Sequence, residues 1–173
     1  MQTLILGGAR SGKSRHAEQL ALASNLKVIY IATAEALDDE MQARIAQHQR
    51  ERPAHWHTVE TPIALAATLR KHDAADTCLL VDCLTLWLSN LLLHADPCLL
   101  ERERAALLHS LPSLQARLIL VANEVGLGIV PDNALARRFR DEAGRLNQSI
   151  AAQVEQVFFL AAGLPLTLKE PQT

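Results

Sequence analysis

Long apolar runs, paired cysteines and an excess of charge of one sign are all absent from this 173-residue sequence. Its apolar stretches are interrupted well short of the roughly 20 residues that cross a bilayer. Its N-terminus lacks the basic region and cleavage site of a signal peptide. The net charge of −2 gives no global electrostatic reason for binding to nucleic acid. We therefore expect a cytoplasmic protein without a membrane span and without a nucleic-acid partner.

The cysteines are few and unpaired. Cys78, Cys83 and Cys98 show no C-x-x-C spacing, so they do not predict a metal site. An odd number of cysteines without a signal peptide indicates reduced thiols. His94 and Cys98 are four residues apart and could share a helix face, but Pro97 favours a helix start between them. We expect buried, structural cysteines.

Apolar strand-like runs alternate along the chain with helical segments. Hydrophobic residues make up 49% of the sequence and charged residues 21%, as in a single globular domain spanning residues 1–173. Strands are expected near 3–6, 28–32, 77–82, 118–122 and 157–161, with shorter pieces at 57–60 and 164–168. Helices are expected at 13–24, 39–50, 63–72, 84–93, 99–108 and 134–154. This order predicts an α/β fold with a mostly parallel sheet flanked by helices.

The first of these strands runs into a glycine-rich segment, Gly7-Gly8-Ala9-Arg10-Ser11-Gly12-Lys13-Ser14, that opens a helix. Its spacing fits the Walker A phosphate-binding loop at every fixed position. The loop amides and the helix N-terminus favour a bound phosphate. Lys13 would reach the β- and γ-phosphates, and the Ser14 hydroxyl would ligate Mg²⁺. The alternative is an ordinary strand-to-helix turn.

Polar residues follow the other strands at the sheet edge where ligands bind. Leu79-Leu80-Val81-Asp82 has the form of a Walker B strand, whose final carboxylate would hold Mg²⁺ directly or through water. Alternatively, Asp82 caps the helix that follows. The other segments at this edge are Thr33-Ala34-Glu35, Glu60-Thr61 and Asn123-Glu124.

Histidines stand out in the region after the second strand. Met41, Ile45 and His48 fall on one face of the charged helix expected at 39–50. From this pattern alone, His48 is most simply an exposed or core-edge histidine. His55-Trp56-His57 alternates as a strand would, which places both histidines on one face as a possible metal pair without an evident third ligand.

A glycine-bearing loop, Asn123 to Pro131, follows a core strand and could approach a ligand with its backbone. The alternative is a plain connecting loop. Arg137, Arg138, Arg140 and Arg145 lie on the next helix, where they bind phosphate or are simply solvated.

Several segments occur in an order that resembles one family. They are Gly7 to Arg15, Tyr30-Ile31-Ala32-Thr33-Ala34, Asp39-Glu40-Met41 with Arg44-Ile45 and His48, Arg52-Pro53, Trp56, Glu60, Val81 to Trp87, Asn123 to Pro131 and Phe139 to Gln148. Over nearly its whole length the chain resembles the bifunctional adenosylcobinamide kinase / adenosylcobinamide-phosphate guanylyltransferases.

The resemblance implies a RecA-like P-loop NTPase fold and two reactions that build the nucleotide loop of adenosylcobalamin. The first phosphorylates the aminopropanol hydroxyl of adenosylcobinamide with ATP or GTP. The second transfers GMP from GTP to that phosphate through a guanylylated His48, giving adenosylcobinamide-GDP and pyrophosphate. It also implies a homo-oligomer, a trimer in the family.

The resemblance further implies roles for individual residues. Lys13 and His48 would be catalytic, and Ser14 and Asp82 would hold Mg²⁺, although some relatives have glutamate where Asp82 stands. The implied nucleotide-binding residues are Gly7, Gly8, Ala9, Arg10, Ser11, Gly12, Lys13, Ser14, Ala32, Thr33, Ala34, Glu51, Arg52, Pro53, Ala54, Glu60 and Asp82.

Two other functions compete with this interpretation. A simple small-molecule kinase would share the phosphate loop and need no nucleophilic histidine. A nucleotide-driven switch would be favoured by the guanine-reading motif Asn-Lys-x-Asp, which the sequence lacks.

Overall fold

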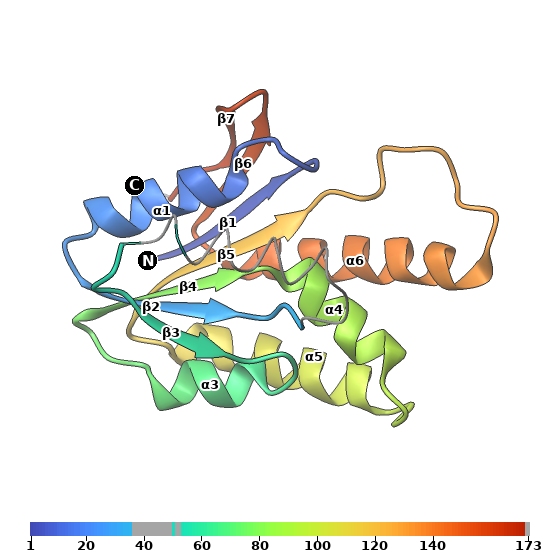
Figure 1. The fold of residues 1–173 in the computed structure, drawn as a ribbon, viewed down its shortest axis with the longest axis horizontal. Coiled ribbons are helices and arrows are strands. Elements are labelled where there is room, and N and C mark those ends of the chain that lie inside the picture. Colours follow the sequence, from blue (N-terminus) through green and yellow to red (C-terminus); the bar gives the residue numbers. More distant parts are fainter. Residues whose placement is uncertain (36–49, 51–52, 172–173) are drawn as a thin grey trace.

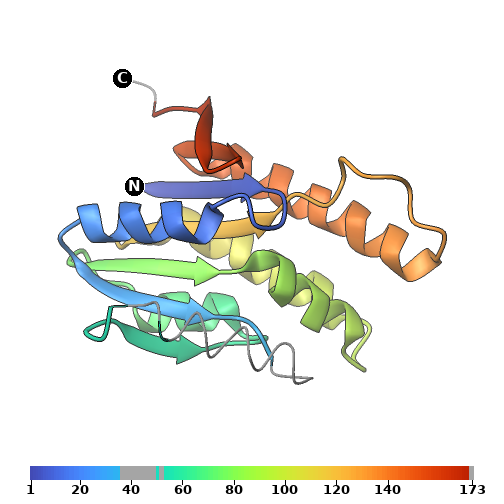
Figure 2. The same cartoon turned by 45° about the horizontal axis from the view of Figure 1, so that its top comes forward.

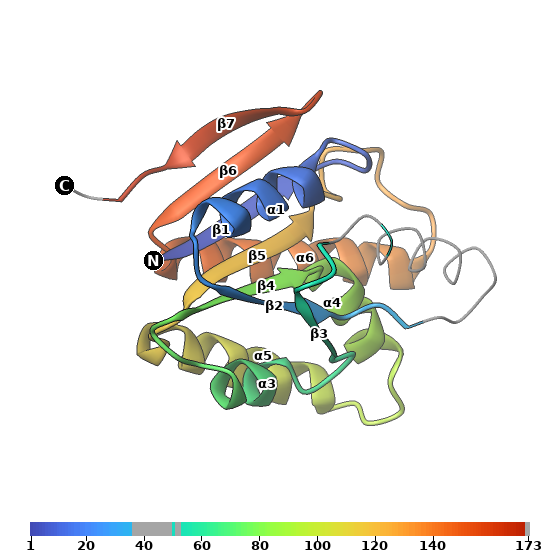
Figure 3. The same ribbon diagram turned by 60° about the vertical axis from the view of Figure 1, so that its left-hand side comes forward.

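In the computed structural model, which describes residues 1–35, 50 and 53–171, seven strands form one sheet (Figure 1). The strands are β1 (Gln2–Gly7), β2 (Lys27–Ala32), β3 (His57–Glu60), β4 (Thr77–Asp82), β5 (Arg117–Asn123), β6 (Gln156–Ala161) and β7 (Leu164–Lys169). Their order across the sheet is β3-β2-β4-β5-β1-β6-β7, and every neighbouring pair is parallel except β6–β7. The predicted mostly parallel sheet is therefore confirmed, and residues 164–168 do form an edge strand, the antiparallel one (Figure 3).

Helices cover both faces of the sheet (Figures 1 and 2). They are α1 (Lys13–Ala23), α3 (Leu65–Lys71), α4 (Leu84–Leu93), α5 (Leu99–Ser110) and α6 (Ala134–Gln153), with a 3₁₀ turn at Leu111–Ser113 after α5. Helix α1 packs on one face, and the other four pack on the opposite face. The predicted helix ranges agree with these to within two residues at each end, except for 39–50, which lies outside the described residues apart from Arg50.

Successive residues of the central strands alternate between the two layers. On β1, Leu4 packs toward the four-helix side and Ile5 toward α1, and both are fully buried. On β2, Ile29 and Ile31 belong to the first layer, whereas Tyr30 belongs to the second. Because both faces are covered, these strands carry apolar side chains without interruption by charge. Polar groups are left to the strand ends.

Two sequence expectations are wrong. Cys98 is exposed, because it lies in the turn at the N-cap of α5, whereas Cys78 and Cys83 are buried as expected. His55 lies in a turn, and β3 begins only at His57, so the two histidines do not share a strand face. The ring of His57 instead lies 6.2 Å from that of His72.

No helix in the described part of the chain is long and apolar enough to cross a membrane.

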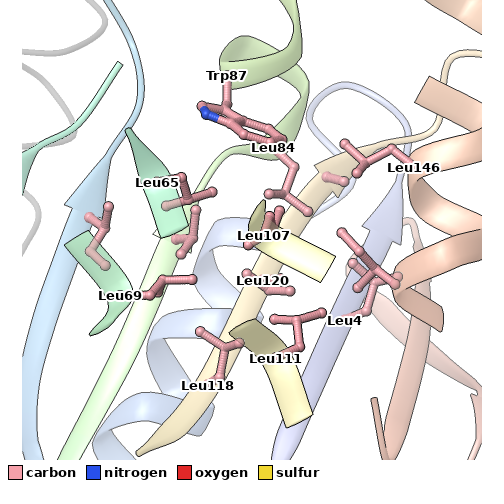
Figure 4. Packing of buried hydrophobic residues seen from close by; sticks show 14 of the residues in the cluster. Leu4, Leu65, Leu69, Leu84, Trp87, Leu107, Leu111, Leu118, Leu120 and Leu146 are labelled. Carbon is pink, nitrogen blue, oxygen red and sulfur yellow. The ribbon is translucent and has the colours of Figure 1, made fainter. Parts of the chain in front are cut away.

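Trp87 anchors the larger of the two apolar layers (Figure 4). Its side chain is fully buried on α4. Its indole N–H donates to the carbonyl oxygen of Ile63 at 2.6 Å, which ties α4 to the segment between β3 and α3. Its apolar ring and its hydrogen bond both contribute to stability.

We predict that Trp87→Phe lowers the free energy of unfolding by about 2–4 kcal/mol, because it leaves a cavity and removes the indole bond to the Ile63 carbonyl, which then keeps only the Leu65 N–H as donor. Urea denaturation followed by circular dichroism measures the change. Leu22→Ala, at a side chain that is 47% exposed on α1, is the control and is expected to shift stability by no more than about 0.5 kcal/mol. Equal losses for the two variants would contradict this role of Trp87.

Candidate functional site

The predicted phosphate loop connects the end of β1 at Gly7 to the start of α1 at Lys13. At Gly7 the backbone φ is 155°, and a Cβ there would lie 2.5 Å from the carbonyl oxygen of Leu160. At Gly12, the N-cap of α1, φ is 96° in the left-handed region. Both positions exclude other residues, for steric reasons at Gly7 and for conformational ones at Gly12. The loop therefore has the curvature and the helix N-terminus of an anion site.

Lys13 lies folded over this loop. Its Nζ donates to the carbonyl oxygen of Gly8 at 2.6 Å and to Ser11 Oγ at 3.5 Å, and its side chain is buried. Burial lowers the pKa of Lys13, and the neighbouring Cys83 and Asp82 oppose this shift. Burial raises the pKa of the Cys83 thiol to about 11, so at neutral pH the charge that faces the ammonium is the Asp82 carboxylate.

The turn between β6 and β7 contacts the phosphate loop and helps to hold it in place. The backbone N–H of Gly163 donates to the carbonyl oxygen of Ser11 at 2.9 Å. A Cβ at Gly12 would lie 3.1 Å from Gly163 Cα. The curvature of the phosphate loop is therefore maintained by a contact with the last hairpin, far away in sequence.

Asp82 ends β4 and is separated from the loop strand by β5 alone. Its Oδ2 accepts a hydrogen bond from the Tyr30 hydroxyl at 2.9 Å. The alternative role as a helix cap is not seen, because Cys83 is the N-cap of α4 and makes no side-chain capping bond. Asp82 pairs in register with Ala32, which pairs with Glu60, so the two carboxylates lie on either side of β2 at the same edge of the sheet.

Thr33 connects the ends of β2 and β4. Its hydroxyl accepts from the Cys83 N–H at 2.9 Å and donates to the Cys83 carbonyl at 2.7 Å, and it is fully buried. Its own carbonyl oxygen accepts from the Asn90 side chain at 2.8 Å, and that amide also donates to Pro62 at 3.1 Å. Cys83, the residue after Asp82, is thus hydrogen-bonded to Thr33 through both its backbone N–H and its backbone carbonyl.

The loop predicted from Asn123 to Pro131 begins beside the phosphate loop. The Glu124 N–H donates to the carbonyl oxygen of Gly7 at 2.9 Å, and the Asn123 N–H donates to Thr85 Oγ1 at 2.6 Å. Of the arginines on α6, Arg137 donates to the carbonyl oxygens of Pro131 and Asp132, and Arg145 pairs with Glu142. These two arginines serve local structure rather than the loop edge.

The structure brings most of the predicted site residues to one edge of the sheet. The residues found there are Gly7, Gly8, Ala9, Arg10, Ser11, Gly12, Lys13, Ser14, Ala32, Thr33, Ala34, Glu60 and Asp82. Pro53 and Ala54 precede β3, where Pro53 accepts from the Trp56 N–H. His48, Glu51 and Arg52 lie outside the described residues.

The residues that hold Asp82 in place were not predicted from the sequence. Tyr30, the only tyrosine in the chain, lies in an otherwise apolar strand. Because a buried tyrosine hydroxyl usually has a hydrogen-bond partner, its position in this strand could have predicted a bond to a nearby polar group. Thr85 and Asn90 lie within the α4 pattern, and their bonds to the ends of β5 and β2 carry no local signature.

The arrangement can bind a polyphosphate. A curved loop of backbone amides, an ammonium and a carboxylate stand together, with the Ser14 hydroxyl in the first turn of α1. In the described part of the chain no three His, Cys, Asp or Glu side chains cluster as a metal site. A nucleotide-bound Mg²⁺ needs fewer, because phosphate oxygens and waters supply most of its ligands.

The sequence of the chain is similar to those of known proteins. A family model described as cobinamide kinase / cobinamide phosphate guanyltransferase matches residues 3–168. The bifunctional adenosylcobalamin biosynthesis protein CobP of Pseudomonas aeruginosa is 62% identical over 169 residues, covering 98% of each chain. The corresponding protein CobU of Salmonella typhimurium is 43% identical over 182 residues, covering 98% of this chain and all of that protein.

Solved structures support the fold. The flagellar accessory protein FlaH of Methanocaldococcus jannaschii superposes with a TM-score of 0.55 at 14% identity, over 98% of this chain and 78% of that one. The P4 protein of bacteriophage phi6, solved in complex with ADP, gives 0.50 at 14% identity, over 95% and 53%. The chain therefore shares the fold of these two proteins.

We predict that Thr33→Val lowers the free energy of unfolding by about 1–3 kcal/mol. The similar shape without a hydroxyl leaves the buried N–H of Cys83 unpaired, and the Cys83 carbonyl keeps only its bond from the Trp87 N–H. Thr33→Ser keeps the hydroxyl and is expected to lose clearly less. Chemical denaturation of the two variants beside the wild type makes the comparison. A larger loss for Ser than for Val would contradict the hydrogen-bonding role.

Proposed function

The chain belongs to the cobinamide kinase / cobinamide phosphate guanyltransferase family, and we propose that it carries out both reactions of that name on adenosylcobinamide. In the first, the γ-phosphoryl group of ATP or GTP passes to the aminopropanol hydroxyl. In the second, GMP passes from GTP to the new phosphate and pyrophosphate leaves. The observation that carries the proposal is the match to bifunctional relatives over 98% of the chain.

The phosphate loop suits the kinase reaction. The loop amides and the N-terminus of α1 would hold the β- and γ-phosphates, and Lys13 would exchange its bond to Gly8 for phosphate oxygens. Phosphoryl transfer asks the protein mainly for position and for charge stabilisation. The ammonium of Lys13, which is buried already, supplies the positive charge that stabilises the phosphates.

Ser14 and Asp82 fit a magnesium ion by their chemistry. Both offer oxygen, the donor that Mg²⁺ prefers, and the Tyr30 hydroxyl orients the carboxylate of Asp82. When bound with the nucleotide, Mg²⁺ neutralises charge that develops on the phosphates. Glu60 ends the next strand but one and is the second candidate for this role.

We propose His48 as the nucleophile of the second reaction. A neutral imidazole nitrogen attacks the α-phosphorus of GTP, a P–N bond forms and the bond to pyrophosphate breaks. The phosphate of the substrate then attacks the same phosphorus, the P–N bond breaks and His48 is regenerated. The covalent step divides one difficult transfer into two easier ones.

We predict that Lys13→Ala removes both activities while the protein stays folded, since loss of its charge slows transfer by about 100-fold or more. Product formation from adenosylcobinamide and GTP, separated by chromatography, measures the effect, and circular dichroism checks the fold. Near-normal kinase turnover in the folded variant would reject the phosphate-loop assignment.

For Asp82→Asn, the expected result is a higher Mg²⁺ concentration at half-maximal rate with little change in nucleotide affinity measured without metal. The amide keeps the shape and loses the charge that favours the cation. Glu60→Gln is the matched control. An unchanged Mg²⁺ requirement in the first variant, with a raised one in the second, would transfer the role to Glu60.

His48→Asn should abolish GMP transfer and the covalent adduct while part of the kinase activity remains, because only the guanylyl transfer needs a protein nucleophile. Protein incubated with α-labelled GTP and Mg²⁺ should retain label that is labile in acid and stable in base. γ-labelled GTP should leave none. Label on His55 or His57 would refute His48 as the nucleophile. No adduct in the wild type would leave a simple kinase or a nucleotide switch as the better function.

A further inference from the structure

An uncharged apolar surface extends from the phosphate loop. It starts where the Glu124 N–H bonds to Gly7, and no charged residue follows until Asp132. Leu127 is 82% exposed, Ile129 97% and Val130 57%. The segment reaches beyond the carboxyl edge of the sheet before it turns into α6 (Figures 1 and 2). Three large apolar side chains exposed in succession at a ligand-binding edge mark a contact surface.

The same segment leads into a cavity between α4 and the start of α6. Its volume is about 300 Å³. Its lining is mainly apolar, with Leu92, Leu93, Leu135 and Phe139, and the polar groups of Ser89 and Asn133 stand among them. Leu93 and Leu135 are themselves more than half exposed. We call the segment 125–131 and this cavity together the apolar face.

We propose that the apolar face binds the corrin macrocycle of the phosphoryl acceptor, an inference that rests on the function proposed above. The acceptor hydroxyl must come within bonding range of the γ-phosphate, so its bulky part has to lie at the same sheet edge as Lys13. The apolar face is continuous with the phosphate loop through the Glu124–Gly7 hydrogen bond. A flexible aminopropanol arm would span from the face to the phosphate.

The chemistry of the face matches a corrinoid. A corrin ring is broad and methyl-rich, and its rim carries uncharged amide arms. Apolar side chains would cover the ring, and the Ser89 hydroxyl and Asn133 amide would meet amide groups of the rim. The nucleotide fits this face poorly, because the segment offers its phosphates no cation.

The junction between the segment and α6 is held in place. Asn133 Oδ1 accepts from the Ala136 N–H at 2.7 Å and caps the helix, and Arg137 donates to the Pro131 and Asp132 carbonyls at 3.0 and 2.6 Å. These bonds fix one end of the segment, and the bonds of Asn123 and Glu124 fix the other. The segment that carries the exposed side chains is thus hydrogen-bonded to the rest of the fold at both of its ends.

Isothermal titration of the full chain with adenosylcobinamide, in the presence of a non-hydrolysable GTP analogue, tests this site. Ile129→Asn and Leu135→Asn should each weaken corrinoid binding by about tenfold or more, as expected for loss of one well-covered apolar side chain. Affinity for the GTP analogue and the molar mass from light scattering should stay at the wild-type values. Leu166→Asn, 61% exposed on β7, is the matched control and should bind the corrinoid normally.

Unchanged corrinoid affinity in both variants, or an equal loss in Leu166→Asn, would overturn the assignment. A changed molar mass would show instead that the face joins copies of this chain. Wild-type protein that phosphorylates adenosylcobinamide while both variants bind it normally would reject the apolar face alone. Wild-type protein that binds the corrinoid through this face without phosphorylating it would reject the proposed function alone.

Discussion

A parallel sheet covered on both faces leaves the ends of its strands as the place for polar chemistry. Leu4 and Ile5 on β1 point into opposite apolar layers, and the pattern repeats on β2, β4 and β5. Backbone groups that leave the sheet at the carboxyl edge still need partners, since unpaired ones are costly when buried. Thr33, Thr85 and Asn90 supply these partners for the ends of β4, β5 and β2. These bonds hold the chain in place where it leaves β4, β5 and β2.

The charges at this edge form a connected set. Burial disfavours the ammonium of Lys13, and the carboxylate of Asp82 compensates in part. The carboxylate is itself oriented by Tyr30, whose ring stacks on Trp56 in the layer beneath α1. Packing in the apolar layer next to α1 therefore affects the orientation of the Asp82 carboxylate. A change in that layer would alter the site without touching a residue of the phosphate loop.

Local patterns allowed a large part of this structure to be predicted. The Walker A spacing located the loop, and apolar runs located the strands, because both depend on neighbouring residues in sequence. Asp82 was found because it directly follows such a run. The bonds from Tyr30 and Thr33 join residues about fifty positions apart, and no periodicity encodes them. Cys98 and His55 were misplaced since each lies one or two residues outside an element, where burial changes abruptly.

The hairpin of β6 and β7 limits which residues can replace the glycines where it contacts the phosphate loop. Gly163 has a φ of 79° and lies against the phosphate loop, bonded to Ser11 and close to Gly12. At Gly163 the left-handed φ alone disfavours other residues, since a Cβ there would meet no atom within 4 Å, whereas a Cβ at Gly12 would lie 3.1 Å from Gly163 Cα. The space for a side chain at Gly12 is thus limited by the backbone of a residue about 150 positions away in the sequence, at the opposite end of the chain.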